Sequence, residues 1–350
     1  MKTLGYAATA HDKPLTPFAF ERRELRPNDV AIEVLYCGIC HTDLHSARND
    51  WGGTSYPLVP GHEIVGRVLE VGREVTRYKA GDAVAVGTMV DACMTCDLCK
   101  KGEEQLCRAN GTTWTFGSPD RVTGETTRGG YAKHLVVRED FVLRVPKGLD
   151  LSRAAPLLCA GITAYSPLRT WNVGPGSRVA VLGLGGLGHM AVKLAAGLGA
   201  SVTVLSRGRG KEADALALGA DRLLASSDAA AMARAASSFD LIIDTVPVKH
   251  DLTPYVPLLD VDGTLVIVGQ LGPVEETNTY PLVAARRRIA GSPSGGIRET
   301  QELLDFCARK NIHPDCELVR MEQVNEAFAR LERSDVRYRF VIDMASFRSE

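Results

Sequence analysis

Four cysteines lie close together in the stretch DACMTCDLCKKGEEQLC, residues 91 to 107. Cys93, Cys96, Cys99 and Cys107 follow the spacing C-x2-C-x2-C-x7-C. This spacing lets a single loop place four thiolates around one tetrahedral zinc ion, which then has no open position for a substrate. A redox role for the C-x-x-C pairs and an iron–sulfur cluster are the alternatives. The pattern favours a structural zinc site over both.

A second set of possible metal ligands is dispersed along the chain. Cys40 stands in YCGICHTDLH, His62 and Glu63 in VPGHEIVG, and Cys159 in APLLCAGIT. Cysteine is among the most buried residue types, and a lone histidine can be a hydrogen-bonded core residue. Spacing alone therefore leaves two interpretations open, a second metal site and four unrelated core residues.

A glycine-rich turn follows a predicted strand in VAVLGLGGLGHMAVKLA. Its G-x-G-x-x-G glycines would make the tight turn, let the backbone approach a pyrophosphate, and let helix pack on strand. The N-terminus of the next helix adds free N–H groups and a positive dipole end. A tight turn without a ligand is the alternative, but the strand–turn–helix context favours a dinucleotide site. Its expected residues are Gly183, Leu184, Gly185, Gly186, Leu187 and Gly188.

The end of the following strand indicates which dinucleotide binds. NAD enzymes usually carry Asp or Glu about 20 residues after the first glycine. This chain has Ser206 there, followed by Arg207, Arg209 and Lys211. A hydroxyl and cations suit a 2′-phosphate, although a solvated loop can carry the same charges. We therefore predict NADP(H), with Ser206, Arg207 and Lys211 at the phosphate.

Two kinds of structure must position these residues. Residues 1 to about 150 contain short β-rich runs separated by Gly and Pro, which indicate an antiparallel or barrel-like region. From about residue 176, β-rich runs alternate with amphipathic helical patterns, which are typical of a parallel, doubly wound sheet. The closing run YRFVIDM is strand-like, and we expect it to pair with the N-terminal β structure.

Composition and charge exclude several classes of protein. The chain has 350 residues, 45% of them hydrophobic and 24% charged, which fits a globular protein of two domains. A formal net charge of −1 gives no basic footprint for nucleic acid. No stretch approaches the roughly 20 apolar residues of a membrane span, and the N-terminus lacks a secretory signal. Nine cysteines without an export signal favour metal chemistry over disulfides, so we expect a cytoplasmic protein.

Several stretches together resemble a known family. CGICHTDLH, PLVPGHEIVGRVLEVG, the four-cysteine loop, LLCAGITAYSPL and GLGGLGHMAVKLA occur in the order found in zinc-dependent medium-chain alcohol dehydrogenases, over essentially the whole chain. GHEIVG, LLCAGIT and FVID resemble the cinnamyl-alcohol-dehydrogenase-like aldehyde reductases. The resemblance implies an α/β fold with two domains. A GroES-like β-barrel catalytic domain would comprise residues 1–155 and 292–350, and a doubly wound Rossmann NADP-binding domain residues 156–291.

The resemblance also implies a catalytic zinc ion in a cleft between the domains. Its ligands would be Cys40, His62 and Cys159, with an open position for water or a substrate oxygen. Glu63 would approach or replace that water, and the Asp43 carboxylate would orient His62. With the cysteine loop, this gives two zinc ions per chain.

A proton relay is implied by CHTDLH. The Thr42 hydroxyl would take the proton, the nicotinamide ribose would pass it on, and His45 would release it to solvent. Without the resemblance, these residues indicate only the polar start of a helix. Trp51 and Trp114 would line an aromatic substrate pocket or, alternatively, pack in the core.

Further cofactor contacts are implied along the Rossmann domain, at Thr163, Thr245, Gly269, Ser292, Pro293 and Ser294. Pro293 departs from the bulky apolar residue that relatives often carry, which affects backbone contacts near the nicotinamide. The family forms homodimers by pairing Rossmann sheet edges, for which GTLVIVG and RRRIAGS are suitable strands.

The implied function is hydride transfer between NADP(H) and a primary alcohol–aldehyde pair, with aromatic or medium-chain substrates. A secondary-alcohol or polyol dehydrogenase of the same fold is one alternative. A non-catalytic, zinc-stabilised dinucleotide-sensing protein with one zinc ion per chain is the other.

Overall fold

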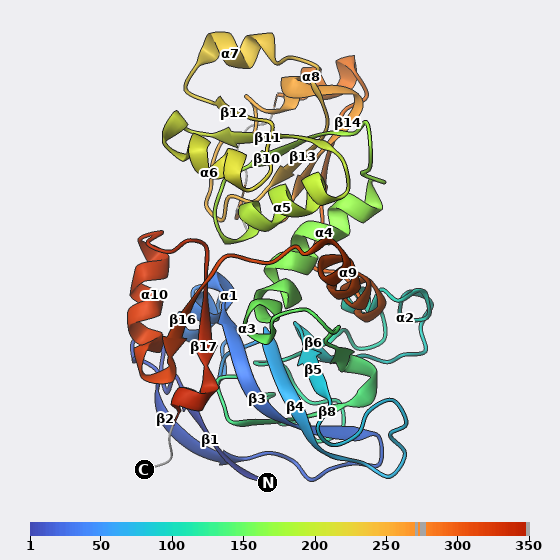
Figure 1. Ribbon diagram of the computed structural model, residues 1–350, viewed down its shortest axis with the longest axis vertical. Coiled ribbons are helices and arrows are strands. Elements are labelled where there is room, and N and C mark those ends of the chain that lie inside the picture. Colours follow the sequence, from blue (N-terminus) through green and yellow to red (C-terminus); the bar gives the residue numbers. More distant parts are fainter. Residues whose placement is uncertain (270–271, 274–277, 348–350) are drawn as a thin grey trace. The chain divides into compact units, whose positions relative to one another are not determined.

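The computed structural model describes residues 1–269, 272–273 and 278–347, and the chain divides into two compact units (Figure 1). The first unit comprises Met1–Cys159 and the chain from Gly295 onward, and the second comprises Ala160–Ser294. We expected the boundaries after residues 155 and 291, and the structure places them a few residues later, after residues 159 and 294. The short 3-10 helix η3 (Ala155–Leu158) contacts strands of the first unit, which explains why residues 156–159 group there.

The second unit is built on a six-stranded parallel sheet in the order β12-β11-β10-β13-β14-β15. Its strands are β10 (Arg178–Leu182), β11 (Ser201–Ser206), β12 (Arg222–Ala225), β13 (Phe239–Asp244), β14 (Leu259–Ile267) and β15 (Arg288–Gly291). Its helices are α4 (Ala160–Thr170), α5 (Gly186–Gly197), η4 (Arg209–Lys211), α6 (Glu212–Ala217), α7 (Ala229–Arg234), η5 (Val256–Leu258) and α8 (Tyr280–Ala284). The predicted doubly wound pattern, in which strands alternate with helices, is confirmed.

Strand composition explains why this sheet is parallel and buried. β10 and β13 have apolar central residues and bury almost every side chain, as expected of strands covered on both faces. Leu182 at the end of β10 is level with Leu205 of β11 and Asp244 of β13. The loops that follow these strands therefore start together at one edge of the sheet.

The first unit contains a mostly antiparallel seven-stranded sheet, in the order β16-β17-β3-β4-β5-β9 with β8 also paired to β3. The strands of this sheet are β3 (Asp29–Ile39), β4 (Ile64–Val71), β5 (Ala83–Val86), β8 (His134–Arg138), β9 (Leu143–Arg144), β16 (Cys316–Arg320) and β17 (Arg339–Asp343). Two small sheets join β1 (Lys2–Ala7) to β2 (Thr16–Glu21) and β6 (Met89–Asp91) to β7 (Thr113–Trp114). Within FVLRVP, residues 141–146, only β9 belongs to the main sheet.

The C-terminal strand returns to the N-terminal half of the chain, as predicted. In Figure 1 the red β17 lies beside the blue β3, and the two pair antiparallel with Phe340 opposite Ile39 and Asp343 opposite Tyr36. The core of the unit contains side chains from both halves of the sequence, including Ile39 and Phe340. The unit is therefore discontinuous in sequence but continuous in packing.

Helices of the first unit are short except for the two near the C-terminus. They are α1 (His41–Arg48), α2 (Asp97–Lys101), η1 (Glu104–Leu106), η2 (Glu139–Phe141), α3 (Leu151–Ala154), α9 (Ile297–Lys310), η6 (Met321–Gln323), α10 (Val324–Glu332) and η7 (Met344–Ser346). α9 buries Thr300, Leu303, Leu304 and Cys307, the i, i+3, i+4, i+7 positions of one face. Over the ranges described above, no helix combines the length and the apolar character that crossing a membrane requires.

Candidate active site and metal centres

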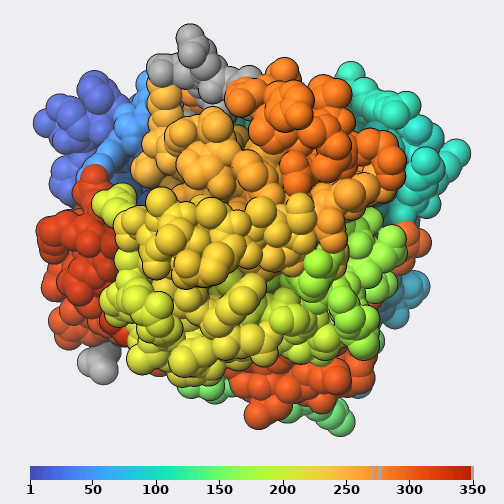
Figure 2. Space-filling view, turned by 90° about the horizontal axis from the view of Figure 1, so that it is seen from above, coloured from blue at the N-terminus to red at the C-terminus, as the bar shows by residue number. Residues whose placement is uncertain are grey.

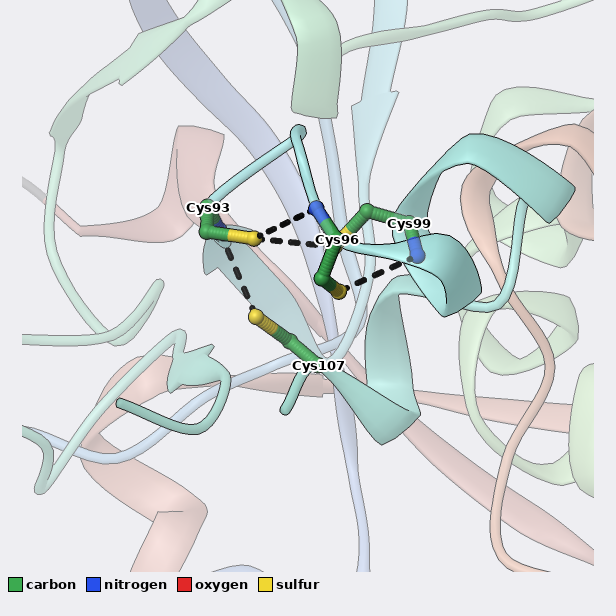
Figure 3. A group of neighbouring side chains, drawn as sticks. All are labelled: Cys93, Cys96, Cys99 and Cys107. Atoms are coloured by element: carbon green, nitrogen blue, oxygen red, sulfur yellow. Dashed lines mark hydrogen bonds between the residues drawn. The ribbon is translucent and has the colours of Figure 1, made fainter. Parts of the chain in front are cut away.

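The four clustered cysteines converge in the loop between β6 and β7 (Figure 3). Cys93, Cys96, Cys99 and Cys107 place their Sγ atoms within 4.8 Å of one another. The Sγ atoms of Cys93 and Cys99 are 3.8 Å apart. A tetrahedron with Zn–S distances of about 2.3 Å has edges of about 3.8 Å, so the group has the size that a zinc ion needs.

Backbone N–H groups of the loop point at the sulfur atoms. The amides of Cys96 and Thr95 donate to Cys93 Sγ at 3.2 and 3.4 Å, and the amide of Cys99 donates to Cys96 Sγ at 3.5 Å. The N–H groups of Thr95 and then Cys96 lower the pKa of Cys93 to about 5, whereas burial raises the pKa of Cys99. Donors aimed at sulfur stabilise thiolates, the form that binds metal.

The dispersed set also converges, as a second metal site would require. Cys40, His62, Glu63 and Cys159 bring their ligand atoms within 4.8 Å of one another, and the two Sγ atoms are 3.9 Å apart. Cys40 caps the start of α1, His62 and Glu63 precede β4, and Cys159 follows η3. Among the described residues, His62 Nε2 and Glu63 Oε2 are buried and have no hydrogen-bond partner, as expected of atoms that would face a metal ion.

Asp43 contacts residues of this group and holds them in position. Its carboxylate accepts hydrogen bonds from the amides of Cys40 and Gly61, at 2.8 and 2.9 Å, and lies 3.1 Å from His62 Nδ1. Burial opposes the charge of His62, but Asp43 raises the pKa of this histidine well above its usual range. Because Nδ1 is engaged by Asp43, Nε2 is the nitrogen left for a metal ion.

Arg339 is a residue of this group that sequence reasoning missed. It lies on β17, is 1% exposed, and donates from Nη2 to Glu63 Oε1. Burial raises the pKa of Glu63 to about 7, and the Arg339 cation limits that rise. A side chain at Gly38 would overlap the Glu63 carboxylate, so the glycine leaves room for the pair. Nothing in the sequence marks Arg339, because Glu63 is 276 positions away.

The predicted relay residues lie on α1, one turn apart. Thr42 Oγ1 is 3.7 Å from Cys40 Sγ, and His45 Nδ1 is 2.7 Å from Asp50 Oδ2. Asp50 was not singled out in the sequence, although it is only five positions from His45. With Nδ1 donating to Asp50, Nε2 of His45 is free to accept a proton.

The two tryptophans are not core residues, so the packed-core interpretation is wrong for both. Trp51 is 49% exposed and Trp114 is 40% exposed. The Trp51 ring lies 5.1 Å from the His45 ring, centroid to centroid. Trp51 therefore flanks α1 at the position of the predicted relay.

The glycine-rich turn has the shape expected of a phosphate-binding turn. Gly183 adopts a φ of +91°, which side chains rarely tolerate, and a Cβ on Gly188 would overlap the Gly183 carbonyl oxygen. Gly185 precedes the first turn of α5, and a Cβ there would meet no atom of the described residues within 4 Å. The second glycine thus faces open space at the N-terminus of a twelve-residue helix. Leu184 is buried beneath the turn, and Gly186 and Leu187 form its first helical residues.

The basic residues after β11 differ in whether their side chains already have a partner in the protein. Ser206 ends β11 and Arg207 is exposed immediately after it. Lys211 Nζ donates to the Leu184 carbonyl oxygen at 3.0 Å, which brings this lysine to the glycine-rich turn. Arg209 pairs with Glu212 at 2.5 Å.

The other expected cofactor residues lie at strand ends or in loops of the second unit. Thr245 is buried and donates from Oγ1 to the Leu182 carbonyl oxygen at 2.8 Å. The Ser292 amide donates to the Ile267 carbonyl oxygen at 3.1 Å, and the buried Ser294 Oγ has no partner in the part of the chain that the structure describes. The remaining three are Thr163, buried on α4, Gly269, after β14, and Pro293, exposed between β15 and α9.

Comparison with known proteins agrees with this construction. The model of the alcohol dehydrogenase GroES-like domain matches residues 26–147, and that of the zinc-binding dehydrogenases matches residues 186–309. The chain belongs to the zinc-binding medium-chain alcohol dehydrogenases, with the GroES-like and Rossmann domains that the sequence predicts.

Individual relatives cover nearly the entire chain. An NADP-dependent alcohol dehydrogenase C from Mycolicibacterium smegmatis is 53% identical over 99% of both chains. The aldehyde reductase YahK of Escherichia coli is 49% identical over 98% of both. A cinnamyl alcohol dehydrogenase structure from Sorghum bicolor has a TM-score of 0.96 and 47% identity, covering 100% of this chain and 99% of that one. A Helicobacter pylori cinnamyl alcohol dehydrogenase solved with NADP(H) has a TM-score of 0.91 and 39% identity, covering 99% of each.

Proposed function

We propose that this protein is an NADP(H)-dependent zinc enzyme that interconverts primary alcohols and aldehydes, with aromatic or medium-chain substrates preferred. The single observation that carries this proposal is the convergence of Cys40, His62, Glu63 and Cys159 in a chain that also holds a separate four-cysteine group. The relatives named NADP-dependent alcohol dehydrogenase, aldehyde reductase and cinnamyl alcohol dehydrogenase support the cofactor and substrate class.

Cys40, His62 and Cys159 would hold a catalytic zinc ion, and the cysteine loop would hold a structural one. When bound, zinc supplies Lewis-acid polarisation of the substrate oxygen, and NADP(H) supplies or accepts the hydride. Asp43 fixes the orientation of His62 through Nδ1, at 3.1 Å. Arg339 holds the Glu63 carboxylate and balances its charge beside the two thiols.

The residues proposed to transfer the proton lie on α1. The Thr42 hydroxyl can exchange a proton with the substrate hydroxyl, and His45 can pass it to solvent through Nε2. Asp50, 2.7 Å from Nδ1, fixes the tautomer that leaves Nε2 available. Trp51, packed on the His45 ring, supplies an aromatic surface beside the relay.

Steady-state kinetics test the substrate class. Cinnamaldehyde and medium-chain aldehydes with NADPH are expected to give higher kcat/KM than a secondary alcohol or a polyol with NADP. A polyol as best substrate by a wide margin would show the alternative polyol dehydrogenase. Elemental analysis is expected to give two zinc ions per chain. One zinc ion without turnover would instead indicate the dinucleotide-sensing protein.

Cofactor choice is tested by Arg207→Ala. Loss of a charged contact to the 2′-phosphate is expected to raise KM for NADPH about tenfold to a hundredfold and to leave KM for NADH unchanged. Arg234→Ala, which removes an exposed arginine from α7, is the matched control and should change neither. Equal effects of Arg207→Ala on both cofactors would exclude Arg207 from the 2′-phosphate site.

The quaternary structure proposed is a cytoplasmic homodimer formed through the edge of the second sheet. β15 is the terminal strand in the sheet order, and α8 presents Tyr280 and Val283, 76% and 78% exposed. Figure 2 shows the orange segment that contains α8 at the surface of the face in view. Light scattering during size-exclusion chromatography should give twice the chain mass of 37.7 kDa. A monomer would refute the dimer.

A further inference from the structure

Asp244 and His250 form a buried pair at the carboxyl edge of the second sheet. Asp244 is the last residue of β13 and is 0% exposed. Its Oδ2 atom lies 3.1 Å from Nε2 of His250, whose side chain is 19% exposed. Within the described ranges neither atom makes a hydrogen bond of normal geometry, with the other or with any third group. The contact between these two atoms therefore decides whether both are satisfied.

The contact made by the other nitrogen of His250 constrains how this pair can be protonated. His250 Nδ1 is 2.9 Å from the Val248 carbonyl oxygen. A carbonyl oxygen only accepts, so Nδ1 carries a hydrogen. In the neutral ring Nε2 would then present a lone pair to an ionised carboxylate, which also only accepts. A hydrogen bond forms only when one further proton lies between Nε2 and Oδ2.

The same residues pack against the glycine-rich turn. Asp244 Oδ1 accepts from the Val246 amide at 3.1 Å, and the Thr245 amide donates to the Leu182 carbonyl oxygen at 3.0 Å. A Cβ on Gly183 would lie 3.0 Å from Thr245 Oγ1 and 3.1 Å from Val246 Cγ2. Residues 245 and 246 thus form a wall of the turn, and the pair connects that wall to residue 250.

We propose that Asp244 and His250 are positioning residues that share one proton and thereby hold segment 245–250 against the glycine-rich turn, setting its affinity for the dinucleotide. This inference rests on the cofactor part of the proposed function. Neither residue belongs to the reacting groups proposed above, so the pair would act on cofactor affinity through Thr245 and Val246.

Loss of the shared proton would leave a buried carboxylate facing a lone pair, which releases the segment. Dinucleotide affinity should therefore be highest at low pH and fall as pH rises through the titration of the pair. Burial raises the pKa of Asp244, which favours the protonated pair. Two other groups face His250. The charge of the Asp251 carboxylate acts on His250, and the Tyr255 ring lies 6.3 Å away, centroid to centroid.

The test is a fluorescence titration of the zinc-loaded, full-length enzyme with NADPH, from about pH 7 to about pH 9.5, where the 2′-phosphate is already ionised. Asp244→Asn replaces Oδ2 by an amide that donates to the Nε2 lone pair, so the contact survives without the extra proton. Wild-type Kd should rise with pH, whereas the Kd of Asp244→Asn should stay near the low-pH wild-type value throughout. His250→Phe keeps a ring but loses the contact, and it should raise Kd about tenfold at pH 7 with kcat at saturating NADPH within about twofold of wild type.

Two outcomes would overturn the inference. One is an Asp244→Asn variant whose Kd keeps the wild-type pH dependence, and the other is a His250→Phe variant with unchanged Kd. A wild type that binds NADH and not NADPH would refute the proposed cofactor, while the same variants titrated with NADH would still test the pair. The apoenzyme gives a readout independent of the cofactor, because ¹⁵N imidazole shifts report the tautomer of His250. A neutral ring protonated at Nε2 would refute the arrangement.

Discussion

Replacing Arg339 by methionine tests how much the ion pair between Arg339 and Glu63, at the candidate zinc site, contributes to the stability of the first unit. Arg339 is 1% exposed and its partner Glu63 is 0% exposed. Methionine has a similar length but no charge, so the substitution leaves the Glu63 carboxylate buried without its cation. A buried charge that loses its partner costs about 3 to 5 kcal/mol.

An exposed pair of the same residue types provides the control. Arg48 donates from Nη2 to Glu332 Oε2 at 2.8 Å, and the two side chains are 42% and 41% exposed. Exposed pairs contribute about 0 to 1 kcal/mol. Arg48→Met should therefore lower the free energy of unfolding by no more than about 1 kcal/mol.

Thermal unfolding measures the difference between these variants. For a unit of this size 1 kcal/mol shifts Tm by about 2 to 4 °C, so Arg339→Met should lower Tm by between about 6 and 20 °C. The scans are run on zinc-loaded protein and again after chelation, because the Arg339 cation also lies beside the thiols of Cys40 and Cys159. A Tm for Arg339→Met within about 4 °C of wild type in both states would refute the assignment of a buried, uncompensated charge.

Two further predictions concern the cysteine loop and the pH dependence of stability. Cys99→Ser should reduce the zinc content from two ions to one and lower Tm, while the kcat of the remaining folded enzyme stays near wild type. The control Cys307→Ser, at a buried cysteine outside both groups, should keep both ions. An unchanged zinc content in Cys99→Ser would contradict a four-thiolate site. Although burial opposes its charge, the amides of Thr123 and Val122 and the Arg26 guanidinium lower the pKa of Asp120 to about 2. A depressed pKa stabilises the fold above the unfolded value, near 4, and this contribution is lost as pH falls to about 2. Denaturation at pH 7 should therefore show Asp120→Asn less stable than wild type by up to about 2 kcal/mol, and this difference should shrink below about pH 4. The control Asp12→Asn, at a carboxylate 60% exposed, should leave the free energy of unfolding unchanged. A constant difference between Asp120→Asn and wild type across this pH range would show that ionisation of Asp120 contributes nothing.

Much of the fold follows from patterns that are local in the sequence. β10, β11 and β13 are apolar runs, and α9 repeats its apolar residues with the period of a helix, so each could be predicted from its own residues. The stretch FVLRVP at 141–146 has the composition of a longer strand, but residues 139–141 form a 3-10 turn and only a two-residue strand follows. Short runs contain too few residues for periodicity to separate these outcomes.

The sequence by itself determined the cysteine loop and the glycine-rich turn. Their residues lie within a few positions of one another, so spacing and local backbone geometry decide how they converge. The tertiary structure alone brought Cys40, His62 and Cys159 together, because β3, β4 and η3 must first assemble. It also revealed Arg339 beneath Glu63 and His250 beside Asp244. Which residues meet in this way depends on the register of the strands and the path of the loops. Both depend on packing across the whole unit and not on any short stretch of sequence.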